Sequence, residues 1–326
     1  MKTDQCRREF LTASAGAVLG LGLGSAALGA RSAETAFKTG LKKAVISDCP
    51  SEDELKRLKD AGFDGVEGGV VDPGRAEKAR AVAEKLGMRI HSVLRGWAEF
   101  NSSDKAKVEE TLAVSVKALE AGKAFGADAV LLVPCRIGGL KMPRPWEFLL
   151  DFDEATNRLR RVTAGDNEPF AEYIKAHNHA IDTSREAVQR LIPAAEKAGV
   201  VIALENVWND LWVKPAHFQN FVASFKSPWV KAYFDIGNHV KYAAPEEWIL
   251  SLGSLLSKCH VKDFKINPAD PNGEGEFVDI RDGGVRWPVV RQALERVGYN
   301  GWMTIEGGDL SLEEHSKRLD LILAGK

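Results

Sequence analysis

Short apolar runs rich in Val and Ile alternate with amphipathic segments of helical period from residue 42 to the C-terminus. This pattern is typical of repeated strand–helix units that build a parallel sheet. Segments such as 73–87 and 183–199 open with Pro or a capping residue and close on Gly, as helices do. Eight runs are predicted strands: 42–48, 64–70, 88–94, 128–134, 200–207, 230–237, 256–264 and 301–308.

The number of repeats separates two architectures of the α/β class. An open doubly wound sheet usually carries a Gly-rich phosphate-binding turn after its first strand, and none follows residues 42–48. Eight strand–helix units match the closed (β/α)8 barrel instead. We therefore predict a single-domain TIM barrel over residues 34–326.

Two long segments, 136–170 and 265–286, depart from the repeat. Both follow predicted strands, which in a barrel places them on the C-terminal face, where catalytic loops lie. We expect the first of them to rim the pocket, with a helical stretch inside residues 142–159.

The first 33 residues have a different composition. A charged start with Arg7 and Arg8 leads into a run rich in Gly, Ala and Leu, and small residues follow it, as in an export signal. The arginine pair resembles a twin-arginine signal, which predicts a periplasmic or otherwise exported protein without a stable membrane span after cleavage. The alternative is an uncleaved membrane anchor, although the apolar run is shorter than a bilayer requires.

Composition and charge limit the partners of the protein. Apolar residues make up 44% of the chain and charged residues 28%, as in ordinary globular domains. The formal net charge of −2 gives no broad basic face, which argues against nucleic acid and favours a small molecule. Beyond Cys6 in the signal, Cys49, Cys135 and Cys259 show no paired spacing and predict no disulfide framework. The oligomeric state stays open, a homo-oligomer included.

Four predicted strands end in an acid or an imidazole: Glu205 in ALENV, Asp235 in YFDIGNH, His260 in CHVKDF and Glu306 in TIEGG. Alternate side chains of a barrel strand point inward, so all four can meet at the mouth of the barrel. Carboxylates held together repel one another, and a divalent cation relieves that repulsion by taking them as ligands. We predict one Mn²⁺, Mg²⁺, Co²⁺ or Zn²⁺ ion there. The alternative is that each residue pairs with a neighbouring Lys or Arg.

Other polar residues are candidate substrate contacts, and three of them have a specific structural alternative. Lys262 shares a strand face with His260, and it either contacts the substrate or pairs with a neighbouring acid. His239 is either a contact or an exposed loop residue, and His91 is either a contact or a core histidine. The basic side chain of Arg281 follows the seventh strand, where it can hold an anion. The candidate set is His91, Asn206, His239, Lys262 and Arg281.

Residues 200–306, with ALENVWND, YFDIGNHV, CHVKDF and TIEGG, resemble the xylose isomerase-like TIM barrels, in particular the sugar phosphate isomerase/epimerase group that includes the ulose 3-epimerases. The resemblance implies a carbohydrate substrate and one divalent metal bound by Glu205, Asp235, His260 and Glu306. It also implies that Glu205 and Glu306 move protons at carbon through an enediolate, the chemistry of an isomerase or epimerase.

The resemblance leaves the substrate open. An exported enzyme rarely meets sugar phosphates, so a free sugar, a keto-sugar or a glycoside is the expected substrate. Two alternatives remain: a metal-dependent lyase or hydratase acting on keto-glycosides, and a non-catalytic sugar-binding module. The second alternative would keep the aromatic residues and lose the metal ligands, whereas this sequence carries all four.

Overall fold

The computed structural model describes residues 37–326. The predicted export signal, with Arg7, Arg8 and Cys6, lies outside the described residues. Within residues 37–326, no helix combines the length and the apolar character that crossing a membrane requires.

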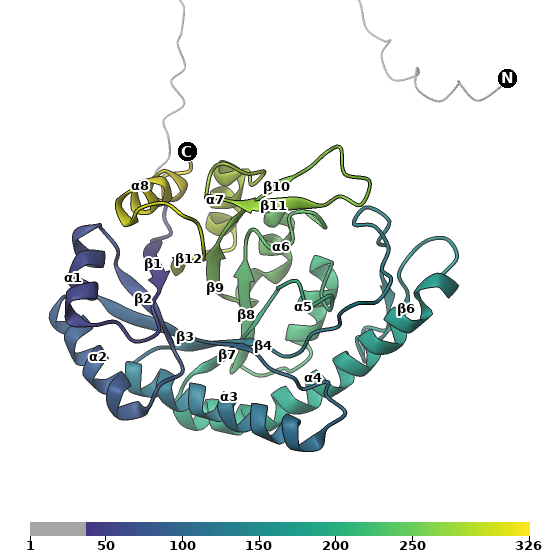
Figure 1. Ribbon diagram of the computed structural model, residues 1–326, viewed down its shortest axis with the longest axis horizontal. Helices are drawn as coiled ribbons and strands as arrows, with labels where there is room; N and C mark the ends of the chain where they lie inside the picture. Colours follow the sequence, from purple (N-terminus) through teal and green to yellow (C-terminus); the bar gives the residue numbers. More distant parts are fainter. Residues whose placement is uncertain (1–36) are drawn as a thin grey trace, which may run out of the picture. The chain divides into compact units, whose positions relative to one another are not determined.

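Eight parallel strands close into a barrel with the neighbour order β1-β12-β9-β8-β7-β4-β3-β2, which confirms the predicted (β/α)8 architecture (Figure 1). Each predicted strand is present, with ends that differ by a few residues from the predicted ones. The barrel strands are β1 (Lys42–Ile46), β2 (Gly65–Gly69), β3 (Arg89–Trp97), β4 (Ala129–Val133), β7 (Val201–Glu205), β8 (Val230–Asp235), β9 (Leu256–Val261) and β12 (Trp302–Ile305).

Helices follow the barrel strands and form the outer layer (Figure 1). Ser51 and Asp104 accept backbone N–H groups at the first turns of α1 and α3, and Gly199 ends α4 in the left-handed conformation, at φ 70°. The helices are α1 (Glu52–Asp60), α2 (Pro73–Lys85), α3 (Lys105–Phe125), α4 (Ala171–Ala198), α5 (Pro215–Ala223), α6 (Pro245–Leu252), α7 (Trp287–Arg296) and α8 (Leu312–Leu323), with 3-10 turns η1 (Glu168–Phe170) and η2 (Gly253–Leu255).

Side chains alternate between the two faces of each barrel strand, and this alternation divides the apolar core into two clusters. Ala129, Leu131 and Val133 of β4 belong to a small apolar cluster with Ala203 and Tyr233. Val130 and Leu132, at the intervening positions, belong to the large cluster that includes the apolar faces of the helices. Every second side chain of a barrel strand therefore points inward, and the same parity decides which polar side chains reach the mouth of the barrel.

The seventh barrel strand is shorter than predicted. It ends at Val261, and residues from Asp263 onward form an antiparallel hairpin of β10 (Asp263–Ile266) and β11 (Gly275–Val278). The Asp263 carboxylate is buried and accepts hydrogen bonds from the backbone N–H of Arg281 (3.0 Å) and Val285 (3.1 Å) and from the indole of Trp287 (3.0 Å). These bonds hold the chain in its turn away from the barrel.

The prediction of a helical stretch within residues 142–159 is wrong. A small hairpin of β5 (Asp151–Phe152) and β6 (Leu159–Arg161) takes its place. The Asp153 carboxylate accepts the backbone N–H groups of Ala155 and Thr156, and Asn157 has a φ of 63°, so the chain turns back instead of continuing helically.

The two long loops meet at the C-terminal face. Gly273, at the tip of the β10–β11 hairpin, has a φ of +71°, and a Cβ atom there would lie 2.8 Å from Cζ3 of Trp146. Phe148 packs edge-on against Tyr173 and Tyr242, which anchors the first loop to the body of the barrel. The segment 136–170 is therefore part of the barrel and not a separate unit.

Candidate metal centre

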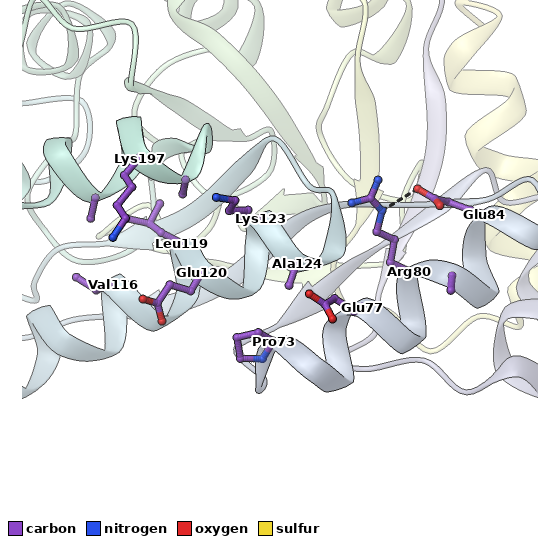
Figure 2. A pocket seen from close by; sticks show the side chains of 13 residues that line it. Pro73, Glu77, Arg80, Glu84, Val116, Leu119, Glu120, Lys123, Ala124 and Lys197 are labelled. Atoms are coloured by element: carbon purple, nitrogen blue, oxygen red, sulfur yellow. Dashed lines mark hydrogen bonds and ion pairs between the residues drawn. The ribbon is translucent and has the colours of Figure 1, made fainter.

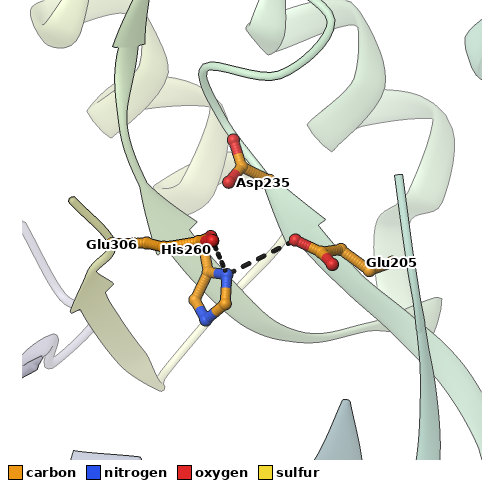
Figure 3. A group of neighbouring side chains, drawn as sticks. All are labelled: Glu205, Asp235, His260 and Glu306. Carbon is orange, nitrogen blue, oxygen red and sulfur yellow. Dashed lines mark ion pairs between the residues drawn. The ribbon is translucent and has the colours of Figure 1, made fainter. Parts of the chain in front are cut away.

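Four neighbouring barrel strands bring the predicted ligands together. Glu205 and Asp235 are the last residues of β7 and β8, His260 is the penultimate residue of β9, and Glu306 directly follows β12. Asp235 lies beside His260 in the strand register. One potential ligand atom from each of the four lies within 4.8 Å of all the others, and Figure 3 shows the side chains converging from their separate strands.

Close contacts already link the members of this cluster. Nδ1 of His260 lies 2.6 Å from Oε2 of Glu306 and 3.4 Å from Oε1 of Glu205. The ammonium group of Lys262 lies 3.0 Å from Oε1 of Glu306 and 3.5 Å from Oδ2 of Asp235. Asp235 and His260 are almost fully buried, whereas the Glu306 side chain is 28% exposed and reaches the open side of the site.

Three buried atoms of the cluster are free to coordinate a cation, because the surrounding protein offers them no regular hydrogen bond. Oδ2 of Asp235, Nδ1 of His260 and Oε2 of Glu306 are buried and make no hydrogen bond of regular geometry, although the last two lie 2.6 Å apart. The other oxygen of Asp235 is occupied, because it accepts the backbone N–H groups of Gly237 (2.9 Å) and Asn238 (2.8 Å). Carboxylate oxygens with one imidazole nitrogen form a donor set suited to Mn²⁺, Mg²⁺, Co²⁺ or Zn²⁺.

Burial and charge act differently on the four groups. Burial raises the pKa of Glu205 to about 7 and raises the pKa of Asp235 as well. At Glu306, burial also favours the neutral acid, but the positive charges of His260 and Lys262 outweigh it and lower the pKa of that carboxyl. Burial opposes a charge on His260, yet Tyr233 and the adjacent carboxylates hold the pKa of its imidazole well above the ordinary value. Without a cation, protons and Lys262 therefore balance the carboxylates.

Cation affinity is expected to rise with pH through about 7, the pKa of Glu205. Below that pH Glu205 holds a proton, and His260, with its raised pKa, also holds a proton that Nδ1 must lose before it can bind a metal. Calorimetric titration with Mn²⁺ at about pH 6 and about pH 8, in buffers of different ionisation heat, measures both the affinity and the protons released. Equal affinities without proton release would contradict this prediction.

Glu67 belongs to the site but was not among the predicted residues. It lies in β2, its side chain is fully buried, and its Oε2 lies 2.6 Å from Nε2 of His260. Its Oε1 accepts the hydroxyl hydrogen of Ser92 at 2.9 Å. Its presence in the strand GVEGG could have identified it from the sequence, because a barrel strand covered on both faces seldom holds an unpaired carboxylate.

Asn206 and His239 lie beside the cluster and bind mainly to the protein. The Asn206 amide donates to the carbonyl of Asp235 (2.9 Å) and to Nδ1 of His239 (3.1 Å), so both of its N–H groups are engaged. His239 is buried against Tyr242 and Trp248, not exposed on a loop. These bonds fix the end of β8, and substrate contact by either residue stays a prediction.

Two further candidates lie apart from the cluster. His91 is buried, stacks on Trp302 at 4.4 Å between ring centroids, and has Nε2 3.0 Å from the Thr304 hydroxyl. Its Nδ1 is buried without a hydrogen-bond partner, so only one ring nitrogen of this core histidine is bonded. Arg281 is exposed, and its backbone N–H is held by Asp263. Substrate contact by His91 or Arg281 stays a prediction. Lys262, in contrast, lies within the cluster, where it pairs with Glu306.

A groove of about 690 Å³ lies elsewhere, on the outside of the barrel between α2, α3 and α4 (Figure 2). Charged side chains of both signs line it, and Arg80 pairs with Glu84 at 2.8 Å. None of the four clustered residues lines it. The convergent acids and imidazole lie at the strand ends, so the candidate metal centre is at the mouth of the barrel and not in this groove.

Comparison with known proteins agrees with this fold. A family model described as xylose isomerase-like TIM barrel matches residues 55–320. No curated protein matches the chain.

Similar solved structures include a D-tagatose 3-epimerase-like protein, with a TM-score of 0.65 and 18% identity over 86% of this chain and 98% of that chain. The 3-keto-D-glucoside 4-epimerase of E. coli has a TM-score of 0.63 and 16% identity over 86% and 98% of the two chains. An L-ribulose 3-epimerase has a TM-score of 0.62 and 17% identity over 87% and 94%.

Proposed function

The chain belongs to the xylose isomerase-like TIM-barrel family, and on this premise we propose that it is a divalent-metal-dependent sugar isomerase or epimerase. The observation that carries the proposal is the convergence of Glu205, Asp235, His260 and Glu306 within 4.8 Å. The two glutamates come from β7 and β12, the outer strands of the group of four, so they flank the two inner ligands.

The proposed reaction moves a proton at a carbon next to a carbonyl group. A divalent cation at the cluster would stabilise negative charge on the oxygens of the resulting enediolate. One glutamate removes the proton, and the other returns it on the opposite face to give the epimer, or to the neighbouring carbon to give the isomer. Glu205, whose pKa burial raises to about 7, is suited to exchange a proton near neutral pH.

Lys262 is the proposed contact for a substrate oxygen. Its ammonium group lies between Glu306 and Asp235 and also over the ring of Phe277, at 5.3 Å. An ammonium group in this position can donate to an oxygen that gains negative charge beside the base. Its ion pair with Glu306 holds it at the edge of the site in the absence of substrate.

The proposed substrates are sugars without a phosphate group. The solved structures cited above are named as a D-tagatose 3-epimerase-like protein, a 3-keto-D-glucoside 4-epimerase and an L-ribulose 3-epimerase, and the sugars in those names carry no phosphate. Export through the twin-arginine-like signal, itself a proposal that rests on Arg7 and Arg8, would also place the protein where free sugars are met.

Solvent exchange at the substrate tests the proposal. The Mn²⁺-loaded protein is incubated in D₂O with D-tagatose, L-ribulose and a 3-keto-D-glucoside, and deuterium uptake and product configuration are followed by NMR. Uptake at the carbon next to the carbonyl, with formation of an epimer or isomer, supports the proposal. Loss of the glycosidic group would indicate the lyase alternative, and binding without any exchange would indicate a sugar-binding module.

The contact between the two long loops predicts a role for Trp146 in closing the site. Trp146 is 58% exposed and meets the hairpin at Gly273. Trp146→Ala is expected to lower kcat/KM by about 3- to 10-fold, because a looser cover admits water, and to leave Mn²⁺ affinity unchanged. Leu250→Ala, at an exposed apolar residue of α6, is the matched control. Identical kinetics in the two variants would show that Trp146 does not cover the site.

A further inference from the structure

Glu67 lies on the far side of His260 from the other carboxylates. The imidazole presents Nδ1 to Glu306 (2.6 Å) and Glu205 (3.4 Å), and it presents Nε2 to Glu67 (2.6 Å). Glu67 and His260 are both almost completely buried, with side-chain exposures of 0% and 1%. Glu67 therefore contacts His260, a proposed metal ligand, but is not itself one of the four clustered residues.

The distances decide which nitrogen of His260 holds a proton when a cation is bound. An ionised carboxylate only accepts hydrogen bonds, so a nitrogen 2.6 Å from Glu67 must donate to it. The proton of the neutral imidazole then sits on Nε2, and Nδ1 keeps a free electron pair directed at the cluster. The opposite tautomer would leave Glu67 facing an electron pair in a buried site, which is costly.

Other buried side chains hold this arrangement in place. The hydroxyl group of Ser92 in β3 donates to Oε1 of Glu67 at 2.9 Å. The ring of Tyr233 in β8 packs against the imidazole, with ring centroids 4.4 Å apart. Residues from β2, β3 and β8 therefore fix the plane and the tautomer of a side chain that β9 supplies.

We infer that Glu67 is a positioning residue that fixes His260 as the Nε2–H tautomer and thereby sets the affinity of the site for a divalent cation. The inference rests on the metal centre of the proposed function and does not depend on which sugar is turned over. The negative charge of Glu67 also makes the imidazole a stronger electron donor, as a carboxylate bonded to a metal-binding histidine does elsewhere.

Glu67→Gln tests the charge with little change in shape. The amide can still bond to His260 and Ser92, but it carries no charge and can present N–H to Nε2. The expected result is a loss of Mn²⁺ affinity of about 10- to 100-fold, measured by calorimetry or by the EPR signal of free Mn²⁺. The control is Asp64→Asn, the same chemical change just before β2, where the carboxylate accepts the backbone N–H of Lys43 at 2.7 Å.

A second measurement uses the unaltered protein and stays decisive if the variant does not fold. With Zn²⁺ bound and histidine labelled with ¹⁵N, the NMR spectrum should show His260 protonated on Nε2, with Nδ1 shifted by the metal. Protonation on Nδ1, or a Glu67→Gln variant that binds Mn²⁺ as tightly as the Asp64→Asn control, would overturn the inference. If the sugar panel shows no turnover but these results hold, the proposed reaction fails and the role of Glu67 stands.

Discussion

Glu306→Gln is expected to lower kcat by about 10²- to 10⁴-fold and to leave Mn²⁺ affinity within about tenfold of the original value. The amide oxygen of Gln can still coordinate a cation, but it cannot take a proton from carbon. Glu306 is the most exposed of the four clustered residues, so the substitution adds no fully buried polar group. The rate of epimer or isomer formation from the best substrate of the panel, together with a Mn²⁺ titration, measures both quantities.

Glu205→Gln is the matched counterpart on the opposite outer strand. If the two glutamates serve opposite faces of the sugar, each variant should still exchange the proton of one epimer and lose exchange with the other. A near-normal rate in Glu306→Gln would mean that this residue only binds the cation. Equal loss of both exchanges in both variants would argue against the two-base arrangement.

Asp235→Asn is expected to weaken Mn²⁺ binding by about 100-fold or more. The oxygen that accepts from Gly237 and Asn238 is retained, while an amide N–H₂ group replaces the oxygen directed at the cluster. Burial raises the pKa of Asp235, so its charge lowers the stability of the metal-free protein above the ordinary pKa of an aspartate. The metal-free variant should therefore melt no lower than the metal-free parent protein.

Thermal melting with and without Mn²⁺ separates the two effects. The parent protein should gain stability as Mn²⁺ is added, because the cation binds only the folded state, and the variant should not respond. Asp64→Asn again serves as the control and should respond as the parent does. A variant that is stabilised by Mn²⁺ as strongly as the parent would exclude Asp235 as a ligand.

The regular part of the fold was predictable because two periodicities recur along the sequence. Buried parallel strands read as short apolar runs, and the intervening helices have clear caps, so all eight strands were located. The same regularity brought out the cluster. Glu205, Asp235, His260 and Glu306 stand at or just beyond the ends of apolar strands, where inward parity leaves few structural uses for a charge.

The parts that were missed depend on side-chain hydrogen bonds, some within a turn and others between residues far apart in the sequence. The turn at Asp153 and Asn157 decides against a helix in 142–159, and the bonds to Asp263 redirect the chain after β9, yet neither effect is visible in local periodicity. Glu67 lies 193 positions from His260, so its significance appears only when β2 and β9 are placed in one barrel. Arg281 was a candidate for its charge and its place after the seventh strand, and its contact with a substrate stays a prediction.

The placement of the ligands also sets an order of events during synthesis. The four ligand residues span 205–306, and Glu67, which supports His260, comes from the first half of the chain. Glu306 stands after the other three in the sequence, so it is the last of the four to leave the ribosome. A nascent chain can form most of the barrel and still lack one of the four ligands. A cation that takes all four residues, as we propose, therefore binds only after β12 has been made and has paired with β1, and it then joins early and late segments of the chain.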